Sequence, residues 1–351
     1  MTHVVEFPKL GLSFTMNEVA FSIGIYDIRW YGVIIGIGFA LAVLYAALMS
    51  KRMNIRMDRM VDAIIVGLIG AIVCARLFYV IFYPGDTYRN NPIEILYIHQ
   101  GGLAIYGGVI GGLVFGGLTA KLKKLRVLAV LDVTVLGYLI GQCIGRWGNF
   151  VNQEAFGSAT ELPWGMYSDN TSLVVPGANV HPCFLYESLL CLLGFVLLHF
   201  FNLKLRRYDG QTFLLYIVWY GVCRFFIEGL RTDSLIIPFT SLKVSQVLAG
   251  ASVLVAVALL IVFRYRNNLT GCGSKKIREA IGQVGASDAI PVTEAEDDAQ
   301  QYSTIFGDLA EEEKGAGETE SEAVEASDEE LGGEPKEEEI PVPDPAGKKS
   351  E

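Results

Sequence analysis

Arginine and glutamate recur at helical spacing near the end of one apolar stretch of this chain. Arg224, Glu228 and Arg231 lie at positions i, i+4 and i+7, and Tyr220 extends the same face by one turn. Residues at this spacing are neighbours on a helix surface, so two guanidiniums flank one carboxylate. The set keeps a net positive charge that can pair with an anion. The alternative interpretation is an internal salt bridge that fixes helix packing.

A second group of polar residues begins at Arg146, where another apolar stretch ends. Asn149, Asn152 and Glu154 follow within eight positions. An arginine beside a tryptophan, here Trp147, is also a common anchor at a membrane interface. The density of amide and carboxylate groups next to this pair favours a binding site over a simple anchor.

The stretches that carry these groups are apolar enough to cross a bilayer. Hydrophobic residues make up 52% of the chain, charged residues only 19%, and the mean hydropathy is +0.39. A water-soluble protein of this length is excluded by such a composition. A bilayer core about 30 Å thick needs roughly 20 apolar residues per helix, and seven such stretches are present. They cover residues 30–50, 60–83, 101–120, 127–147, 184–203, 211–231 and 244–263.

Positive charge alternates from one connection to the next. Residues 51–59, 121–126 and 204–207 are rich in lysine and arginine, whereas the connections between them contain few. Basic loops stay in the cytoplasm, so all connections agree on one orientation, with the N-terminus outside and the C-terminus cytoplasmic. The fold class that follows is an all-α integral membrane protein, a bundle of seven transmembrane helices.

Residues 281–351 differ sharply from the rest of the chain. They contain 22 acidic and 4 basic residues, whereas residues 1–280 contain 16 acidic and 24 basic ones. Because they hold few large apolar groups, they cannot bury enough surface to offset their ordering entropy. We expect a seven-span catalytic domain over residues 1–280 and a disordered, acidic cytoplasmic tail over residues 281–351.

The predicted orientation brings polar residues of several spans to the outer face. Tyr31 starts the first span, Tyr106 lies early in the third, and His181, Tyr186 and Glu187 start the fifth. Ionisable groups within membrane spans are costly and usually functional. A pore or carrier needs polar groups along its whole path, so this one-sided distribution favours a cavity open to the outer leaflet. Arginines at headgroup depth suit the phosphate of an anionic phospholipid.

Metal and nucleotide chemistry find no support in the sequence. The six cysteines form no C-x-x-C pair, and the four histidines are not spaced as metal ligands. No G-K-[ST] motif follows the glycines of the third span, which argues against a phosphate loop. Gly108, Gly112 and Gly116 instead form a stripe of small residues that lets helices approach closely. We expect no metal, no cofactor and no nucleic-acid partner.

The most specific motif of the chain is Gly-Arg-x-Gly-Asn-Phe-x-Asn-x-Glu at residues 145–154. With Trp30-Tyr31-Gly32 and the histidine and tyrosine of the fifth span, it resembles the prolipoprotein diacylglyceryl transferase family over roughly residues 15–265. The resemblance implies a multi-pass enzyme of the bacterial cytoplasmic membrane. The oligomeric state is left open by the sequence, although a closed seven-span bundle in the lipid bilayer can work as a monomer. Such an enzyme moves the diacylglyceryl group of phosphatidylglycerol to the lipobox cysteine in a prolipoprotein signal peptide. A thioether forms and glycerol 1-phosphate is released.

Under this resemblance the nucleophile is the substrate's thiol, and the enzyme supplies positive charge. Arg146 and Arg231 are expected to hold the lipid phosphate. Arg224 would polarise the displaced oxygen, and Glu228 would orient the arginines of its own helix. Tyr106 stands where many family members have a histidine, which is a candidate base. It is expected to position substrate while the positive field lowers the pKa of the thiol.

The other polar or small residues near the outer face are expected to contact the substrates. They are Tyr31, Gly107, Gly108, Asn149, Asn152, Glu154, His181, Tyr186, Glu187 and Tyr220. Two other functions remain open, a transporter for an anionic solute and an inactive lipid-binding homologue. The transporter requires a polar route on the cytoplasmic side, where only Asp62 and Asp132 lie near helix ends.

Overall fold

Seven long helices dominate the computed structural model, which describes residues 2–24, 26–83, 85–98, 101–232, 234, 236 and 243–280. Each of the seven is long and apolar enough to cross a membrane, which confirms the predicted number of spans. They are α1 (Trp30–Arg52), α2 (Met57–Ile81), α4 (Ile105–Leu122), α5 (Val127–Val151), α7 (Cys183–Lys204), α8 (Gln211–Leu230) and α9 (Val244–Val262). Their bounds differ from the predicted ones by a few residues.

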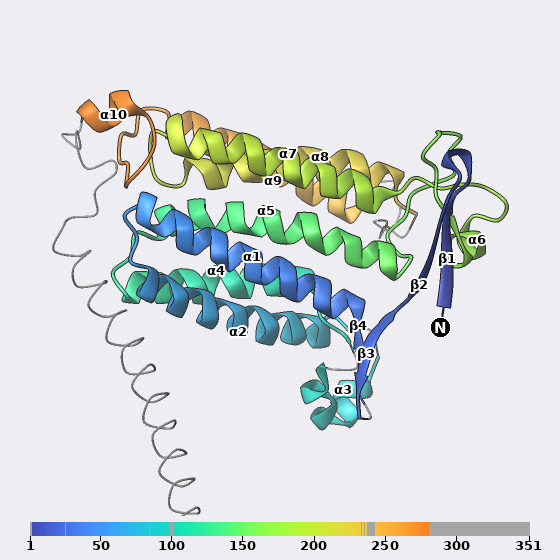
Figure 1. The fold of residues 1–351 in the computed structure, drawn as a ribbon. Coiled ribbons are helices and arrows are strands. Elements are labelled where there is room, and N and C mark those ends of the chain that lie inside the picture. The colour runs from blue at the N-terminus through green and yellow to red at the C-terminus, as the bar shows by residue number, and fades with distance from the viewer. Residues whose placement is uncertain are drawn as a thin grey trace, which may run out of the picture. The chain divides into compact units, whose positions relative to one another are not determined.

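Helix α5 has the most buried core of the bundle. It packs along α1 on one side and against α7 and α8 on the other, while α8 also packs along α9 (Figure 1). Val135, Leu136 and Leu139 of α5 are buried against Cys191 of α7 and Tyr216 of α8. This central position explains why the polar residues at the end of α5 meet those of α7 and α8.

Helices α2 and α4 form a tightly packed pair (Figure 1). A side chain on Gly111 would collide with the backbone carbonyl of Gly70 and, at 2.6 Å, with Cβ of Cys74. Gly116 faces Gly67 at 3.5 Å in the same way. Small residues thus permit close contact, as the glycine stripe predicted, and the partner of the stripe is α2.

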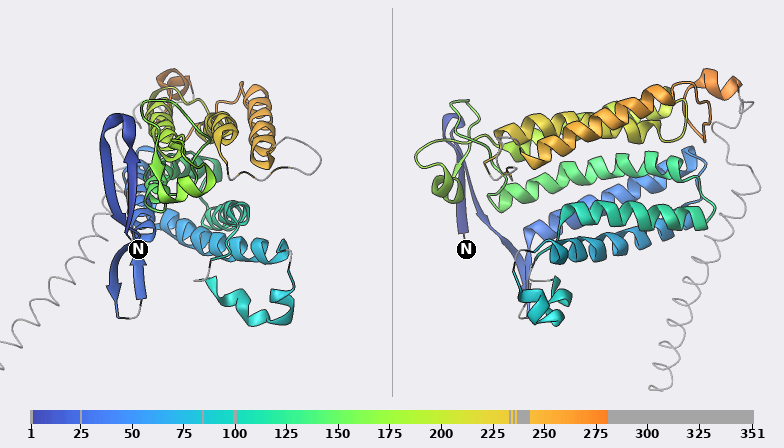
Figure 2. Two further views of the ribbon diagram at one scale, coloured as in Figure 1. Left: turned by 90° about the vertical axis from the view of Figure 1, so that its right-hand side faces the viewer. Right: turned by 180° about the vertical axis from the view of Figure 1, so that it is seen from behind.

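Short strands at one end of the bundle correct the expectation of an all-helical protein. β1 (Thr2–Phe7) pairs antiparallel with β2 (Leu12–Asn17) and with β5 (Tyr167–Ser168), and β3 (Val19–Ile23) pairs with β4 (Tyr26–Arg29). Val5 and Phe7 are buried while their neighbours are not, which is the alternation of a half-buried strand. We call this end, where α1 begins, the strand end (Figure 2).

The third span starts later than predicted because two glycines belong to a loop. Gly101 and Gly102 have positive φ angles of 88° and 74°, and α4 begins only at Ile105. The guanidinium of Arg76 on α2 donates hydrogen bonds to five backbone carbonyls of residues 94–102. Arg76 therefore organises this loop, and its donors are used within the protein.

The opposite end carries the basic connections, and we call it the basic end. There the segment after α9 folds back onto the connection between α7 and α8. Arg206 is fully buried and donates to Asp132 at 2.8 Å and to the carbonyl oxygen of Cys272 at 2.9 Å. A short helix, α10 (Lys275–Ala280), follows. The predicted acidic tail, residues 281–351, lies outside the described residues.

Candidate active site

Side chains from α5, α7 and α8 meet at the strand end and form a set of ion pairs. Glu187 of α7 is its centre. Its carboxylate lies 2.5 Å from Nη2 of Arg146, 3.2 Å from Nη1 of Arg224 and 3.7 Å from Nη1 of Arg231. Nη2 of Arg224 also lies 2.7 Å from Oε2 of Glu228. We call these five residues the arginine cluster.

Arg231 enters the cluster from outside the helix. Arg224 and Glu228 lie one turn apart on α8, as their spacing predicted, but α8 ends at Leu230. Arg231 is the C-cap, with extended backbone at φ −69° and ψ 143°, so its predicted helical position is wrong. Its backbone forms an antiparallel bridge with Gly157, which turns the chain at the helix end and leaves the guanidinium within reach of Glu187.

The arginine cluster is electropositive on its accessible side. Three guanidiniums face two carboxylates, which leaves one positive charge. The carboxylate side chains are 6% (Glu187) and 3% (Glu228) exposed, whereas the guanidinium side chains of Arg146 and Arg224 are 19% and 18% exposed. An anion that approaches the cluster therefore meets the arginines first. A phosphodiester, which carries a single negative charge, would neutralise the cluster.

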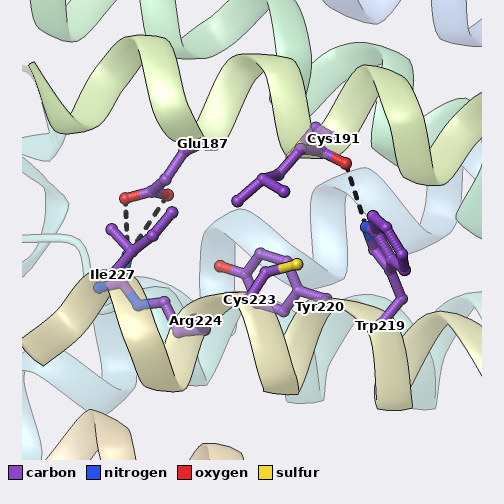
Figure 3. Close-up of a pocket in the computed structure, with 8 residues that line it drawn as sticks. Glu187, Cys191, Trp219, Tyr220, Cys223, Arg224 and Ile227 are labelled. Atoms are coloured by element: carbon purple, nitrogen blue, oxygen red, sulfur yellow. Dashed lines mark hydrogen bonds and ion pairs between the residues drawn. The ribbon is translucent and has the colours of Figure 1, made fainter.

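A small cavity adjoins the cluster between α7 and α8 (Figure 3). Glu187, Tyr220 and Arg224 line one end of it, and Trp219 closes the other by donating to the carbonyl oxygen of Leu190 at 3.0 Å. Its volume of about 10 Å³ holds about one water molecule. The cavity is therefore too small for a larger ligand, and the accessible part of the cluster is the exposed side of Arg146 and Arg224. Tyr220, a predicted substrate-binding residue, lines the cavity.

The motif residues after Arg146 form a polar cap on α5. Nη1 of Arg146 lies 3.5 Å from Oδ1 of Asn149, whose amide donates to Glu154 at 2.9 Å. Asn152 donates to the same carboxylate oxygen at 3.4 Å. Glu154 itself is exposed, so it can still accept hydrogen bonds from a ligand's hydroxyl groups. The motif thus joins an exposed acceptor to the arginine cluster.

Several aromatic side chains lie near the start of α7, next to Glu187 in the chain. The Tyr186 hydroxyl accepts a hydrogen bond from the Trp164 indole at 2.8 Å and lies 3.2 Å from Nδ1 of His181. Burial lowers the pKa of His181, because a desolvated imidazolium is disfavoured. Tyr31 of α1 lies against Gly148, where a side chain would come within 2.7 Å of its ring. These contacts place three of the predicted substrate-binding residues around the same end of α5 and α7.

Comparison with known proteins identifies the family of the chain. The family model described as prolipoprotein diacylglyceryl transferase matches residues 18–262. The chain belongs to this family. The phosphatidylglycerol-prolipoprotein diacylglyceryl transferase of Finegoldia magna is 43% identical over 249 residues, which cover 71% of this chain and 96% of the relative. That of Clostridioides difficile is 40% identical over 234 residues, 67% of this chain and 90% of the relative.

The family match covers all seven membrane spans of the described chain. The enzyme of the same name from Bacillus licheniformis is 39% identical over 262 residues, which cover 72% of this chain and 94% of the relative. Every residue of the arginine cluster lies inside the matched range, whereas the β1–β2 hairpin lies before it. With seven spans and this family, the protein is a multi-pass protein of the bacterial cytoplasmic membrane.

Three predicted site residues of the transferase lie on α4, away from the ion pairs. Tyr106 is an exposed residue of the first turn of α4, and within the described chain it makes no hydrogen bond to the arginine cluster. Gly107 packs against α2, where a side chain would come within 3.0 Å of the Cα atom of Ala75. Gly108 faces Ala71 at 3.6 Å. Their contact with substrate remains a prediction.

One residue of this end was missed by the sequence analysis. Lys243, the N-cap of α9, donates from Nζ to the carbonyl oxygens of Glu228 at 2.6 Å, Gly229 at 3.3 Å and Arg231 at 2.8 Å. The sequence gives it only as a single lysine in an otherwise nearly uncharged loop. A lone cation just before the helix that follows α8 was the available signal, because helix C-termini attract positive charge.

Proposed function

We propose that this protein transfers the diacylglyceryl group of phosphatidylglycerol to the lipobox cysteine of a prolipoprotein. The observation that carries the proposal is the arginine cluster, which holds three guanidiniums and two carboxylates at one end of the bundle. Its net charge matches one phosphodiester. The relatives named above act, by their names, on phosphatidylglycerol and prolipoproteins.

In the proposed reaction the cysteine sulfur attacks the glyceryl carbon that bears the phosphate ester. A carbon–sulfur bond forms, the carbon–oxygen bond to phosphate breaks, and its electron pair stays on the phosphate oxygen. Glycerol 1-phosphate leaves, and the thiol proton passes to the solvent or to the leaving phosphate. Because negative charge grows on the phosphate, guanidiniums fixed in advance stabilise the transition state.

We propose a distinct task for each residue of the arginine cluster. Arg146 and Arg231 bind the phosphate from α5 and from the end of α8, and Arg224 stabilises the displaced oxygen. Glu187 joins Glu228 as an orienting group, because its carboxylate contacts all three arginines. Asn149, Asn152 and Glu154 then contact the glycerol headgroup, whose hydroxyls suit amide and carboxylate partners.

The substitution Tyr106→Phe tests whether the Tyr106 hydroxyl takes the proton of the substrate's thiol. A free thiol has a pKa of about 8.5 and a phenol about 10, so the phenol is a poor base for it. We expect Tyr106→Phe to keep the pH profile of kcat and most of the activity, since the positive field acts on the thiol without the hydroxyl. A fall of kcat by about 100-fold or more, typical for loss of a general base, would contradict this expectation.

The function itself is tested with purified protein in detergent, labelled phosphatidylglycerol and a lipobox peptide. Lipidation read by mass spectrometry should add one diacylglyceryl group to the peptide and release labelled glycerol phosphate. The same peptide with serine in place of cysteine should stay unmodified. Lipidation of neither peptide, with bound lipid recovered intact, would favour an inactive lipid-binding homologue.

A specific observation weakens the rival transporter. Asp62 and Asp132, the acidic groups of its required route, are engaged at the basic end. Asp62 pairs with Lys123 at 2.6 Å, and Asp132 pairs with the buried Arg206 at 2.8 Å. Both carboxylates therefore already have a cationic partner within the described residues.

We also propose an orientation in the membrane, with the arginine cluster at the outer face and the basic connections in the cytoplasm. We propose that the enzyme acts as a monomer.

A further inference from the structure

Glu228 and Arg231 of the arginine cluster lie at the end of α8, where the last backbone carbonyls need donors from elsewhere. The final carbonyl groups of a helix have no partner within the helix. Here Lys243 provides one ammonium group to three of them, those of Glu228, Gly229 and Arg231, at 2.6, 3.3 and 2.8 Å. Its positive charge also lies at the negative end of the helix dipole.

Lys243 is one of two side chains at the start of α9 that donate hydrogen bonds to the backbone of α8. Gln246, on the first turn of α9, donates from Nε2 to the carbonyl oxygen of Phe225 at 3.0 Å. The two side chains bind α8 at different depths, however. Gln246 reaches a carbonyl one turn before the helix end, whereas Lys243 binds the backbone of Glu228 and Arg231 directly.

Arg231 is positioned differently from the other two arginines of the cluster. Arg146 and Arg224 project from the interior of helices, whereas Arg231 lies beyond the end of α8. Its guanidinium is 3.7 Å from Glu187, compared with 2.5 Å for Arg146. On one side its segment is held by Ser158, whose backbone N–H donates to the Leu230 carbonyl at 2.8 Å. Lys243 holds the other side.

We propose that Lys243 is a positioning residue for transfer, which fixes Arg231 and Glu228 through their backbone carbonyls without touching the substrate. The inference rests on the proposed role of Arg231 in binding the lipid phosphate. A helix-capping lysine that served stability alone would lower the melting temperature and leave the kinetics of the folded enzyme unchanged. A positioning lysine changes kcat, because a displacement of a catalytic group by about 1 Å can slow a reaction roughly 100-fold.

The test compares Lys243→Met, Lys243→Arg and Gln246→Met in steady-state transfer from phosphatidylglycerol to a lipobox peptide, with thermal unfolding of each variant. We expect Lys243→Met to lower kcat about 10- to 100-fold with a much smaller change of KM for the peptide. Lys243→Arg should restore most of the rate, because a guanidinium also offers several donors to carbonyls. Gln246→Met, which removes a contact between the same helices, should keep the wild-type kcat.

Lys9→Met serves as the control for loss of an outer lysine, since Lys9 pairs with the exposed Glu161 at 2.7 Å and lies outside the cluster. It should behave as wild type. Equal losses in Lys243→Met and Gln246→Met would overturn the proposal, because they would reflect helix packing in general. A lower melting temperature with unchanged kcat in Lys243→Met would overturn it as well.

A double substitution separates this inference from the role of Arg231. In an Arg231→Lys background, Lys243→Met should reduce kcat by much less than in the wild type, because coupled residues are not additive. If Arg231→Lys and Arg231→Ala leave transfer intact, the proposed role of Arg231 fails. If Arg231→Ala abolishes or impairs transfer while Lys243→Met has its full effect in the wild type and in the partly active Arg231→Lys variant, only the positioning role of Lys243 fails.

Discussion

Arg146→Ala is expected to lower kcat/KM for transfer about 100- to 1,000-fold, the loss typical of removing one preorganised donor from a developing negative charge. The protein should remain folded, because Arg224 and Arg231 would still face the two carboxylates of the cluster. Kinetics with a lipobox peptide and thermal unfolding of the same purified protein measure both quantities. Arg146→Lys, which keeps the charge but loses the planar fork, should retain part of the activity.

Glu187→Ala is the comparison for Arg146→Ala, because it removes a negative charge from the arginine cluster where Arg146→Ala removes a positive one. It would leave three guanidiniums around Glu228 alone, and breaking a buried ion pair by removing one partner costs about 3–5 kcal/mol. We therefore expect this variant to lose stability as well as activity. Normal turnover by Arg146→Ala, or equal destabilisation of both variants, would show that the arginine cluster is a structural device and not a phosphate site.

Local signals were sufficient to predict the helices and one face of the site. Hydropathy located all seven spans, because a bilayer demands long apolar helices whatever their neighbours are. The spacing of Arg224 and Glu228 predicted their ion pair, which forms within one helix at i and i+4. The motif that starts at Arg146 indicated a polar cap on α5, and its three polar residues are linked to one another.

Contacts between helices were not predictable from the same signals. Glu187 was expected to bind substrate, yet the structure makes it the common partner of three arginines, two of which lie on other helices. Arg76 is an arginine within an apolar span, and its donors are used by the carbonyls of a loop that follows later in the chain. Both outcomes depend on which loop returns to which helix. The N-terminal strands were not predicted because they too depend on distant contacts. Their buried face packs against residues far along the chain, such as Phe150 and Val180.

Arg206→Met is expected to lower stability strongly at the opposite end of the bundle. The Arg206 side chain is fully buried, 2.8 Å from Asp132 and 3.5 Å from Asp209. Its Nη2 also donates to the carbonyl oxygens of Thr270 and Cys272. Methionine fills a similar volume but leaves two buried carboxylates without this cation, which costs about 3–5 kcal/mol. The change is measured as a lower unfolding temperature in a mild detergent.

The neighbouring Arg207→Met is the matched control, because it removes the same charge from an exposed side chain, where substitutions usually change stability by less than about 0.5 kcal/mol. Turnover per folded molecule should stay near wild type in both variants. Asp132 caps the start of α8 by accepting from the backbone N–H groups of Gly210 and Phe213, both at 2.8 Å, and Lys243 holds its far end. An unfolding temperature of Arg206→Met equal to that of Arg207→Met would mean that this buried network does not hold the basic end together. A loss of turnover in the folded fraction would instead mean that the two ends of α8 are coupled.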